Sequence, residues 1–276
     1  MILPFFLDKL HTGAFWLFRQ NFLKNKVEKG AFEELWGDVF EDYAASVIER
    51  GLDSHNSSKQ EKVIINPKYN QKGNVECADV AVCGDDTLIL FECKSTILSA
   101  ECKFGGDFNK FYDGCPSVKK GIEQLGRAVQ KLGNLHQSQR QVVDGIDICK
   151  IKKIYPVLVL SDRIFSGLFM NDVLDSKFQE KVQYQYLIKH LQIMPLTVLT
   201  IYDLELLEPY IQDKSLYKRL DEWLNFFEKN KRRIGFNAYL HNLINRENRS
   251  NQFMDDGFAE IVSEGQEFLE SHGINE

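Results

Sequence analysis

The chain contains an aspartate, a glutamate and a lysine whose types and spacing could build a metal site: Asp79, Glu92 and Lys94. Carboxylate oxygens are the ligands that hard divalent cations take. Lys94 would share a face with Glu92 on a strand, because strand side chains alternate. Beside a bound metal, its ammonium can hold water or offset charge that develops on a phosphate. The alternative is a structural salt bridge at a strand end.

A predicted hairpin brings the two carboxylates together. Its arms are residues 75–83 and 87–95, and Gly84-Asp85-Asp86 between them suits a tight turn. With a two-residue loop, counting outward places Asp79 opposite Glu92, with Cβ atoms about 5 Å apart. Like charges so placed repel each other unless a cation lies between them. A one-residue slip in the turn would send one carboxylate to the opposite face.

Helices and strands that could support this hairpin lie on both sides of it. An apolar stripe predicts a helix over 32–48, ended by Gly51, and residues 62–69 offer a short strand. After the hairpin, Pro116 opens a helix closed by Gly133-Asn134, and residues 152–162 form another apolar strand. The second hairpin arm is apolar on both faces, which places it centrally in a sheet covered by helices. The order predicts an α/β core.

The remainder of the chain is predicted to be mainly helical. The expected elements are a helix near 176–191, a short strand within 193–201, and helices around 216–227 and 236–244. The predicted organisation is an N-terminal helical extension (1–29), the core (30–165), a mostly helical part packed on it (166–250) and an acidic tail (251–276).

Charge and composition restrict the class of protein. The net charge is −6, but seven acidic residues and no Lys or Arg follow residue 249, leaving 34 basic and 33 acidic residues elsewhere. Lys229, Lys231, Arg232 and Arg233 form a basic group that could hold phosphates or simply be a solvated helix end. No apolar run is long enough to span a bilayer, and the six cysteines lack zinc spacing. These features predict a cytoplasmic protein with reduced thiols and no membrane partner.

The sequence Asp79, hairpin, Glu92-Cys93-Lys94 resembles the signature of the PD-(D/E)XK nuclease superfamily, although Ala78 replaces the proline of the family name. The resemblance covers about half of the chain. It implies a restriction-endonuclease-like core, in which helix, three strands, helix and strand form a mixed central sheet flanked by helices.

Two flanking helices extend the resemblance. Gly37-Asp38-Val39-Phe40-Glu41-Asp42-Tyr43 is similar to the family pattern G-x-x-F-E-x-Y, which implies that Glu41 is another acidic ligand. Its alternative is a solvated helix glutamate. The helix after the hairpin often carries a glutamine in this family, and Gln124 matches it. The residues Lys120, Gln124, Arg127 and Lys131 share one stripe that could line a phosphate path or be a solvated basic face.

The resemblance implies a divalent-metal-dependent nuclease. Asp79, Glu92, Glu41 and the backbone carbonyl of Cys93 would bind Mg²⁺, for which Mn²⁺ could substitute, and Lys94 would orient the attacking water. Gln124 would assist, while Lys120 and Arg127 would bind the substrate. Family habit favours DNA and an endonuclease of a restriction, repair or anti-phage type. The C-terminal helical part would bind a second copy of the chain or a partner protein.

Two other classes of protein remain open. A cysteine hydrolase could use Cys93 or Cys115 with a histidine base, although no histidine is spaced for it. Under the nuclease hypothesis, Cys93→Ser is nearly silent. A nuclease-like module without catalysis, kept for nucleic-acid binding or complex assembly, is the second alternative, and metal binding would separate it from an enzyme.

Overall fold

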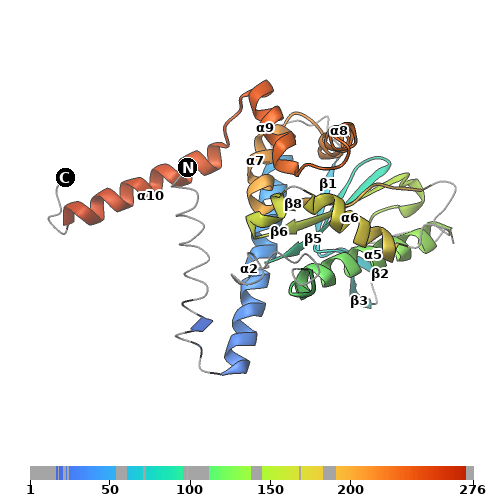
Figure 1. Cartoon of the computed structure of the whole chain (residues 1–276), viewed down its shortest axis with the longest axis horizontal. Coiled ribbons are helices and arrows are strands. Elements are labelled where there is room, and N and C mark those ends of the chain that lie inside the picture. The colour runs from blue at the N-terminus through green and yellow to red at the C-terminus, as the bar shows by residue number, and fades with distance from the viewer. Residues whose placement is uncertain are drawn as a thin grey trace.

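The computed structural model describes residues 17, 19–20, 23, 25–53, 61–70, 73–95, 98, 112–137, 145–167, 169–182 and 191–271. These residues form an α/β protein in which helices cover both faces of a mixed sheet (Figure 1). Most of the predicted N-terminal extension lies outside the described residues. The part that is described enters the long helix α2 (Lys26–Asp53), which crosses the expected boundary between residues 29 and 30.

The main sheet runs in the order β1-β4-β5-β6, with β7 and β8 both pairing to β6. The pairs β1·β4 and β4·β5 are antiparallel, and those from β5 onward are parallel. The strands are β1 (Lys62–Ile65), β4 (Val80–Cys83), β5 (Thr87–Lys94), β6 (Lys153–Leu160), β7 (Gln192–Ile193) and β8 (Thr197–Thr200). Because β7 and β8 follow residue 165, the sheet extends into the part that was expected to be mostly helical.

The β4–β5 hairpin has the predicted register. Val80 pairs with Phe91 and Cys83 with Leu88, and Gly84 N donates to Thr87 O at 2.9 Å. The predicted first arm, 75–83, is wrong in its extent, because the chain bends at residues 77–79. The residues before this bend form β3 (Gly73–Glu76), which pairs with β2 (Lys68–Asn70) in a separate two-stranded hairpin.

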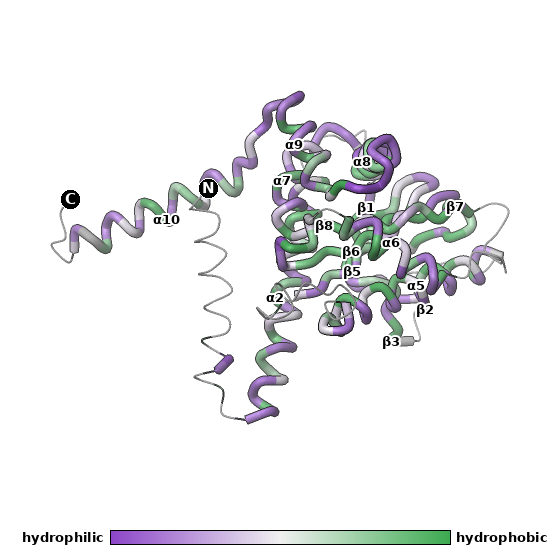
Figure 2. The backbone as a smooth tube through the Cα atoms, in the orientation of Figure 1, coloured by the Kyte–Doolittle hydropathy of each residue, from purple (hydrophilic) through white to green (hydrophobic). Residues whose placement is uncertain are grey.

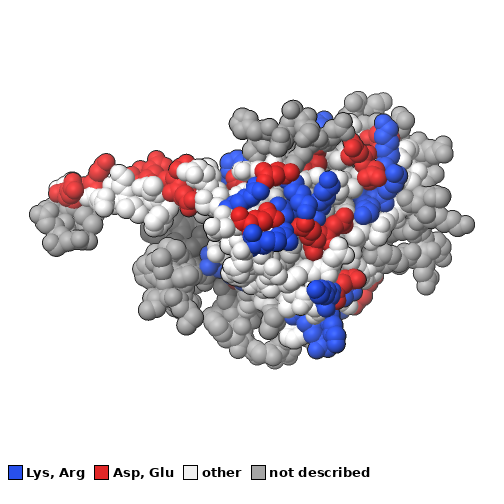
Figure 3. Space-filling model, turned by 90° about the horizontal axis from the view of Figure 1, so that it is seen from above, with Lys and Arg blue, Asp and Glu red and all other residues white. Residues whose placement is uncertain are grey.

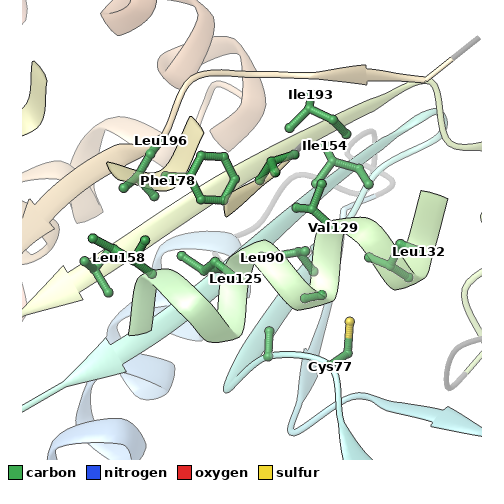
Figure 4. Close-up of a cluster of buried hydrophobic side chains, with 14 of the residues drawn as sticks. Cys77, Leu90, Leu125, Val129, Leu132, Ile154, Leu158, Phe178, Ile193 and Leu196 are labelled. Carbon is green, nitrogen blue, oxygen red and sulfur yellow. The ribbon is translucent and has the colours of Figure 1, made fainter. Parts of the chain in front are cut away.

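Helices α5 (Pro116–Gln137) and α6 (Met170–Lys181) cover one face of the sheet. Leu125 and Val129 of α5 pack over Leu90 and Leu158, and Phe178 of α6 joins the same buried cluster (Figure 4). α5 begins at Pro116 as predicted, but it continues through Gly133-Asn134, so that predicted end is wrong.

The opposite face is covered by α2, α7 (Ile201–Ile211), α8 (Leu216–Lys229) and α9 (Phe236–Glu247). The predicted end of α2 at Gly51 is wrong: the helix continues, and a Cβ at Gly51 would overlap the Ile211 side chain. Glycine is needed there because α2 and α7 approach closely. The predicted apolar stripe is buried only from Ala44 onward, since Leu35 and Val39 are exposed.

The remaining elements differ from the prediction in extent. Helices α8 and α9 lie where they were expected, and α7 was not predicted. α6 begins earlier than the helix predicted near 176–191, and residues 183–190 of that prediction lie outside the described residues. Short 3-10 helices cover Ile148–Lys150 and Arg163–Ser166. The predicted acidic tail contains α10 (Gln252–Ser271), a helix that projects from the body with alternating hydrophilic and hydrophobic positions (Figures 1 and 2).

Crossing a bilayer demands a helix that is both long and apolar. Among the described residues, no helix has both properties.

Candidate functional site

The bend before β4 directs the carboxylate of Asp79 into the β4–β5 ladder. Asp79 N donates to Phe91 O at 3.0 Å, although Phe91 is the register partner of Val80. The Asp79 side chain then accepts a hydrogen bond at Oδ2 from Cys93 N at 2.6 Å. The carboxylate thus satisfies a backbone amide that the bent strand leaves without a carbonyl partner.

The ammonium of Lys94 lies among three carboxylates. Its Nζ atom is 2.6 Å from Glu92 Oε1, 3.5 Å from Asp79 Oδ2 and 3.9 Å from Glu41 Oε1. It also donates to the backbone carbonyl of Cys93 at 3.0 Å. The five groups predicted to hold a metal or orient water therefore come together, and we call Glu41, Asp79, Glu92 and Lys94 the carboxylate site.

The carboxylate site draws its residues from both sides of the sheet. Glu92 and Lys94 project from β5 toward the face covered by α5, whereas Glu41 belongs to α2, which covers the other face. Gly121 of α5 allows the helix to lie close to β5, because a Cβ there would be 3.3 Å from Lys94 Cγ and 3.5 Å from Glu92 Cγ. The helices thus enclose the end of β5 on both sides.

The electrostatics of the site follow from burial and from its excess of carboxylates. Burial, reinforced by the charge of Asp79, raises the pKa of Glu92 to about 8 and that of Glu41 to about 7. Burial also raises the pKa of Asp79, against the opposing charge of Lys94. Burial lowers the pKa of Lys94, but the carboxylates of Glu92 and Asp79 outweigh it and raise that pKa overall. Protons therefore compete with any cation for these carboxylates near neutral pH.

A pocket of about 490 Å³ adjoins the carboxylate site, and Asp79 and Glu92 form part of its wall. We call it the side pocket. Gln124, Arg127 and Lys131 of α5 line it on one side, and Tyr69 lies beneath Lys131, whose Nζ is 3.7 Å from the ring centroid. Three residues of the predicted α5 stripe therefore face one pocket. The fourth, Lys120, is exposed, and its charge offsets a small part of the rise that burial causes in the pKa of Asp79.

The donor set fits Mg²⁺ in kind, but the side chains are not arranged around a common point. Carboxylates and a backbone carbonyl are the oxygen ligands that this ion takes. Within the described ranges, no three His, Cys, Asp or Glu side chains stand together as a metal-binding group. Lys94 Nζ lies among the carboxylates, so a cation bound there would require the ammonium to move away from Glu92.

Three of the basic residues near the C-terminus, Arg232, Arg246 and Arg249, form ion pairs with acids. Arg232 forms ion pairs with Asp172 and Asp175, and Arg249 pairs with Asp213. Figure 3 shows Lys and Arg interleaved with Asp and Glu on one face of the molecule, whereas the charged side chains of the projecting helix are all acidic. Of the four residues of the basic group, these ion pairs involve Arg232, so both possibilities, a phosphate site and a solvated helix end, stay open.

The thiol of Cys93 is unsuited to act as a nucleophile. It is buried within the core on the α2 side of the sheet. Burial and the charges of Asp79 and Glu92 raise its pKa well above the ordinary value, whereas a nucleophilic cysteine needs a lowered pKa. Cys115 is also buried. This environment weakens the cysteine hydrolase alternative.

Tyr69 and the hairpin that carries it were missed as parts of the site. Tyr69 belongs to β2, and Val75 and Glu76 of β3 also line the side pocket. The expected single strand over 75–83 hid this hairpin. A sequence signal was present in Asn70 to Gly73, a turn-forming stretch, but nothing in the spacing indicates that the hairpin folds against α5.

Comparisons with known proteins give little further information. No protein-family model matches the chain, and no curated protein matches its sequence. Among solved structures, the chain is similar to the small subunit of the heterodimeric restriction endonuclease R.BspD6I, with 15% identity and a TM-score of 0.31. The similarity covers 75% of this chain and 88% of that one. A TM-score this low does not establish a shared fold, so membership of the PD-(D/E)XK superfamily stays a prediction.

Proposed function

We propose that this chain is a divalent-metal-dependent nuclease that hydrolyses phosphodiester bonds of DNA, as an endonuclease of a restriction, repair or anti-phage type. The observation that supports it is the convergence of three carboxylates on one ammonium at the end of β5. A structural salt bridge balances its charges, because unpaired buried charge is costly. An excess of carboxylates persists where it serves another purpose, and binding a cation is the simplest such purpose.

Each residue has a role under this proposal. Asp79, Glu92, Glu41 and the Cys93 carbonyl would hold Mg²⁺, or Mn²⁺ in its place. The metal would supply Lewis-acid chemistry, activating water and neutralising charge on the phosphate. Lys94, once displaced from Glu92, would hold the attacking water or offset charge on the phosphate. Gln124 would position a reacting group through its amide, which lies beside Glu92 in the side pocket.

Lys120 and Arg127 would hold the DNA backbone. Both lie on the exposed side of α5, near the carboxylate site. Phosphate contacts of this kind fix the position of the nucleic acid without reading its sequence. A partner protein or a second copy of the chain would bind the helical part after residue 165. Helix α10 leaves large apolar side chains exposed there, namely Phe253, Met254, Phe258, Ile261, Val262 and Phe268.

A catalytically silent module is the second candidate. It is favoured by the finding that no three acidic, His or Cys side chains of the described residues already form a metal-binding group. Titration calorimetry with Mg²⁺ and Mn²⁺ separates the two candidates. Binding of either ion, lost in Asp79→Asn, supports the nuclease, and the absence of binding at neutral and alkaline pH supports the silent module.

Lys94→Ala tests the proposed function directly. The purified protein is incubated with supercoiled plasmid, linear duplex, single-stranded DNA and RNA, each with Mg²⁺ or EDTA. We expect cleavage that requires Mg²⁺ in the native protein and is abolished in Lys94→Ala, with the fold intact by circular dichroism.

Lys153→Ala is the matched control for Lys94→Ala. Lys153 begins β6 at the opposite end of the sheet and pairs with Asp221 at 3.6 Å. Its loss removes an equal charge from the same sheet, so cleavage should be unchanged. Undiminished Mg²⁺-dependent cleavage in Lys94→Ala would show that the assignment is wrong.

A further inference from the structure

The side pocket has a size that suits one nucleotide. Its volume of about 490 Å³ lies within the range of small-ligand sites. α5 forms one side, and the β2–β3 hairpin, through Tyr69 and Val75, forms the other. A double helix is too wide to enter a pocket of this volume, whereas a nucleotide turned out of its stack fits.

Two cations face the side pocket without acidic partners. Neither Arg127 nor Lys131 has a carboxylate within ion-pair distance among the described residues. By contrast, Lys119 of the same helix pairs with Asp113, and Lys181 pairs with Glu123 at 3.0 Å. The ring of Tyr69 holds the Lys131 ammonium in place through a cation–π contact at 3.7 Å. On its α5 side the pocket thus presents two cations that can meet an anion, whereas the acids Glu76, Asp79 and Glu92 line other parts of its wall.

The uncharged residues of the lining suit the base and sugar of a nucleotide. Val75, Ala78 and Ala128 offer small apolar surfaces, against which a base or sugar can lie. Gln124 Oε1 is buried there, and among the described residues no group donates a hydrogen bond to it. A buried acceptor without a donor is costly, and an amino group on a base edge would satisfy it.

We propose that the side pocket binds one unstacked nucleotide next to the phosphate held at the carboxylate site, so that the substrate is single-stranded DNA. This inference rests on the proposed function for its scissile phosphate. Asp79 and Glu92 belong to both the carboxylate site and the pocket wall, so a nucleotide in the pocket adjoins the reacting centre. Arg127 and Lys131 would bind its flanking phosphate, while a paired and stacked strand would first have to open.

The test measures binding apart from cleavage. The native protein in EDTA is titrated against a labelled single-stranded DNA of about 12 nucleotides and the corresponding duplex, by fluorescence anisotropy. We expect the single strand to bind at least about tenfold more tightly. The slope of log affinity against log salt is negative, and Arg127→Ala and Lys131→Ala should each make it less steep by about 0.7, the value for one phosphate contact on a single strand. Lys119→Ala, on the same helix but outside the pocket, should leave both quantities unchanged.

The outcomes separate this inference from the proposed function. Equal affinity for duplex and single strand would overturn the inference, as would an equal loss in Lys119→Ala and Lys131→Ala, which would indicate general attraction. Tighter binding of an RNA of the same sequence would overturn the choice of DNA. If single-strand binding depends on the pocket but no substrate is cleaved with Mg²⁺ or Mn²⁺, the proposed function fails and the pocket assignment stands. Mg²⁺-dependent cleavage of duplex and single strand at equal rates supports the function and overturns the pocket assignment.

Discussion

Two clusters of charged side chains in this protein differ in their balance of acids and bases, and the pKa values of their acids shift in opposite directions. At the carboxylate site, Lys94 lies among three acids. In the helical part, the buried Arg219 binds both oxygens of Glu247, at 2.9 and 2.8 Å, and a third nitrogen donates to a backbone carbonyl, Tyr210 O. Arg246 also donates to Glu247 at 2.8 Å, so the acids of this second cluster have cationic partners.

The pKa values of the acids show the difference. The hydrogen bonds from Arg219 lower the pKa of Glu247 to about 2. At the carboxylate site, burial and a neighbouring like charge raise the pKa of Glu92 to about 8. A satisfied network stabilises the fold, whereas an unsatisfied one is maintained at a cost in stability. Two differences separate the clusters: the acids of the carboxylate site outnumber their cationic partner, and Glu92 is more deeply buried than Glu247.

The largest expected effect is on cleavage in Glu92→Gln. Removing one carboxylate should lower Mg²⁺-dependent cleavage by at least about 10³-fold. It should not lower the melting temperature in EDTA at pH near 8. Burying the carboxylate of Glu92 costs stability at that pH, and burying a neutral amide avoids this cost. Glu247→Gln is the matched control: the same change should lower the melting temperature and leave the cleavage rate of the folded protein unchanged. A destabilised Glu92→Gln protein would contradict the comparison.

Arg219→Ala should give the largest loss of stability. It leaves Glu247 without its principal partner, and breaking a buried pair costs about 3 to 5 kcal/mol. Urea denaturation measures this free energy of unfolding. Arg246→Ala removes an exposed member of the same cluster and should cost less than about 1 kcal/mol. An equal loss of stability in Arg219→Ala and Arg246→Ala would contradict the prediction, because it would show that the buried arginine contributes no more than the exposed one.

The pH dependence of stability should have opposite signs for the two clusters. Because the fold raises the pKa of Glu41 from 4.5 to about 7 and that of Glu92 from 4.5 to about 8, the metal-free protein should lose stability as pH rises from 4.5 to these values. Glu247, with its pKa lowered to about 2, contributes stability that is lost as pH falls below its ordinary value of 4.5. Melting temperatures in EDTA across this range measure both effects. Glu92→Gln should flatten the decline between pH 4.5 and about 8, and a melting temperature that rises across this interval would contradict the assignment.

The features predicted best depend on local rules. The turn at Asp85-Asp86 sets the β4–β5 register, and strand alternation places Glu92 and Lys94 on one face. Glu41 was predicted from the family resemblance, and its Oε1 atom lies 3.9 Å from Lys94 Nζ. The structure brings these residues together, and their catalytic roles stay predictions.

The features predicted poorly depend on tertiary contacts. Gly51 was expected to stop a helix, but it allows α2 to approach Ile211 of α7, and nothing local separates the two uses. The start of α7 did carry a local signal that was overlooked: Thr200 and Asp203 form a capping box. The folding of β2–β3 against α5, which creates the side pocket, has no comparable signal in the sequence.

The bend before β4 has a consequence for how substitutions among relatives should be interpreted. Asp79 Oδ2 accepts the hydrogen bond of Cys93 N, so this position needs an acceptor of that length for the sheet to close, whatever the chemistry. Asparagine can supply the acceptor but carries no charge. A lineage that exchanges Asp and Asn here would be preserving the strand geometry, and only a lineage restricted to Asp would be under selection for charge. Finding either Asp or Asn at this position in every relative is therefore no sign of an active enzyme.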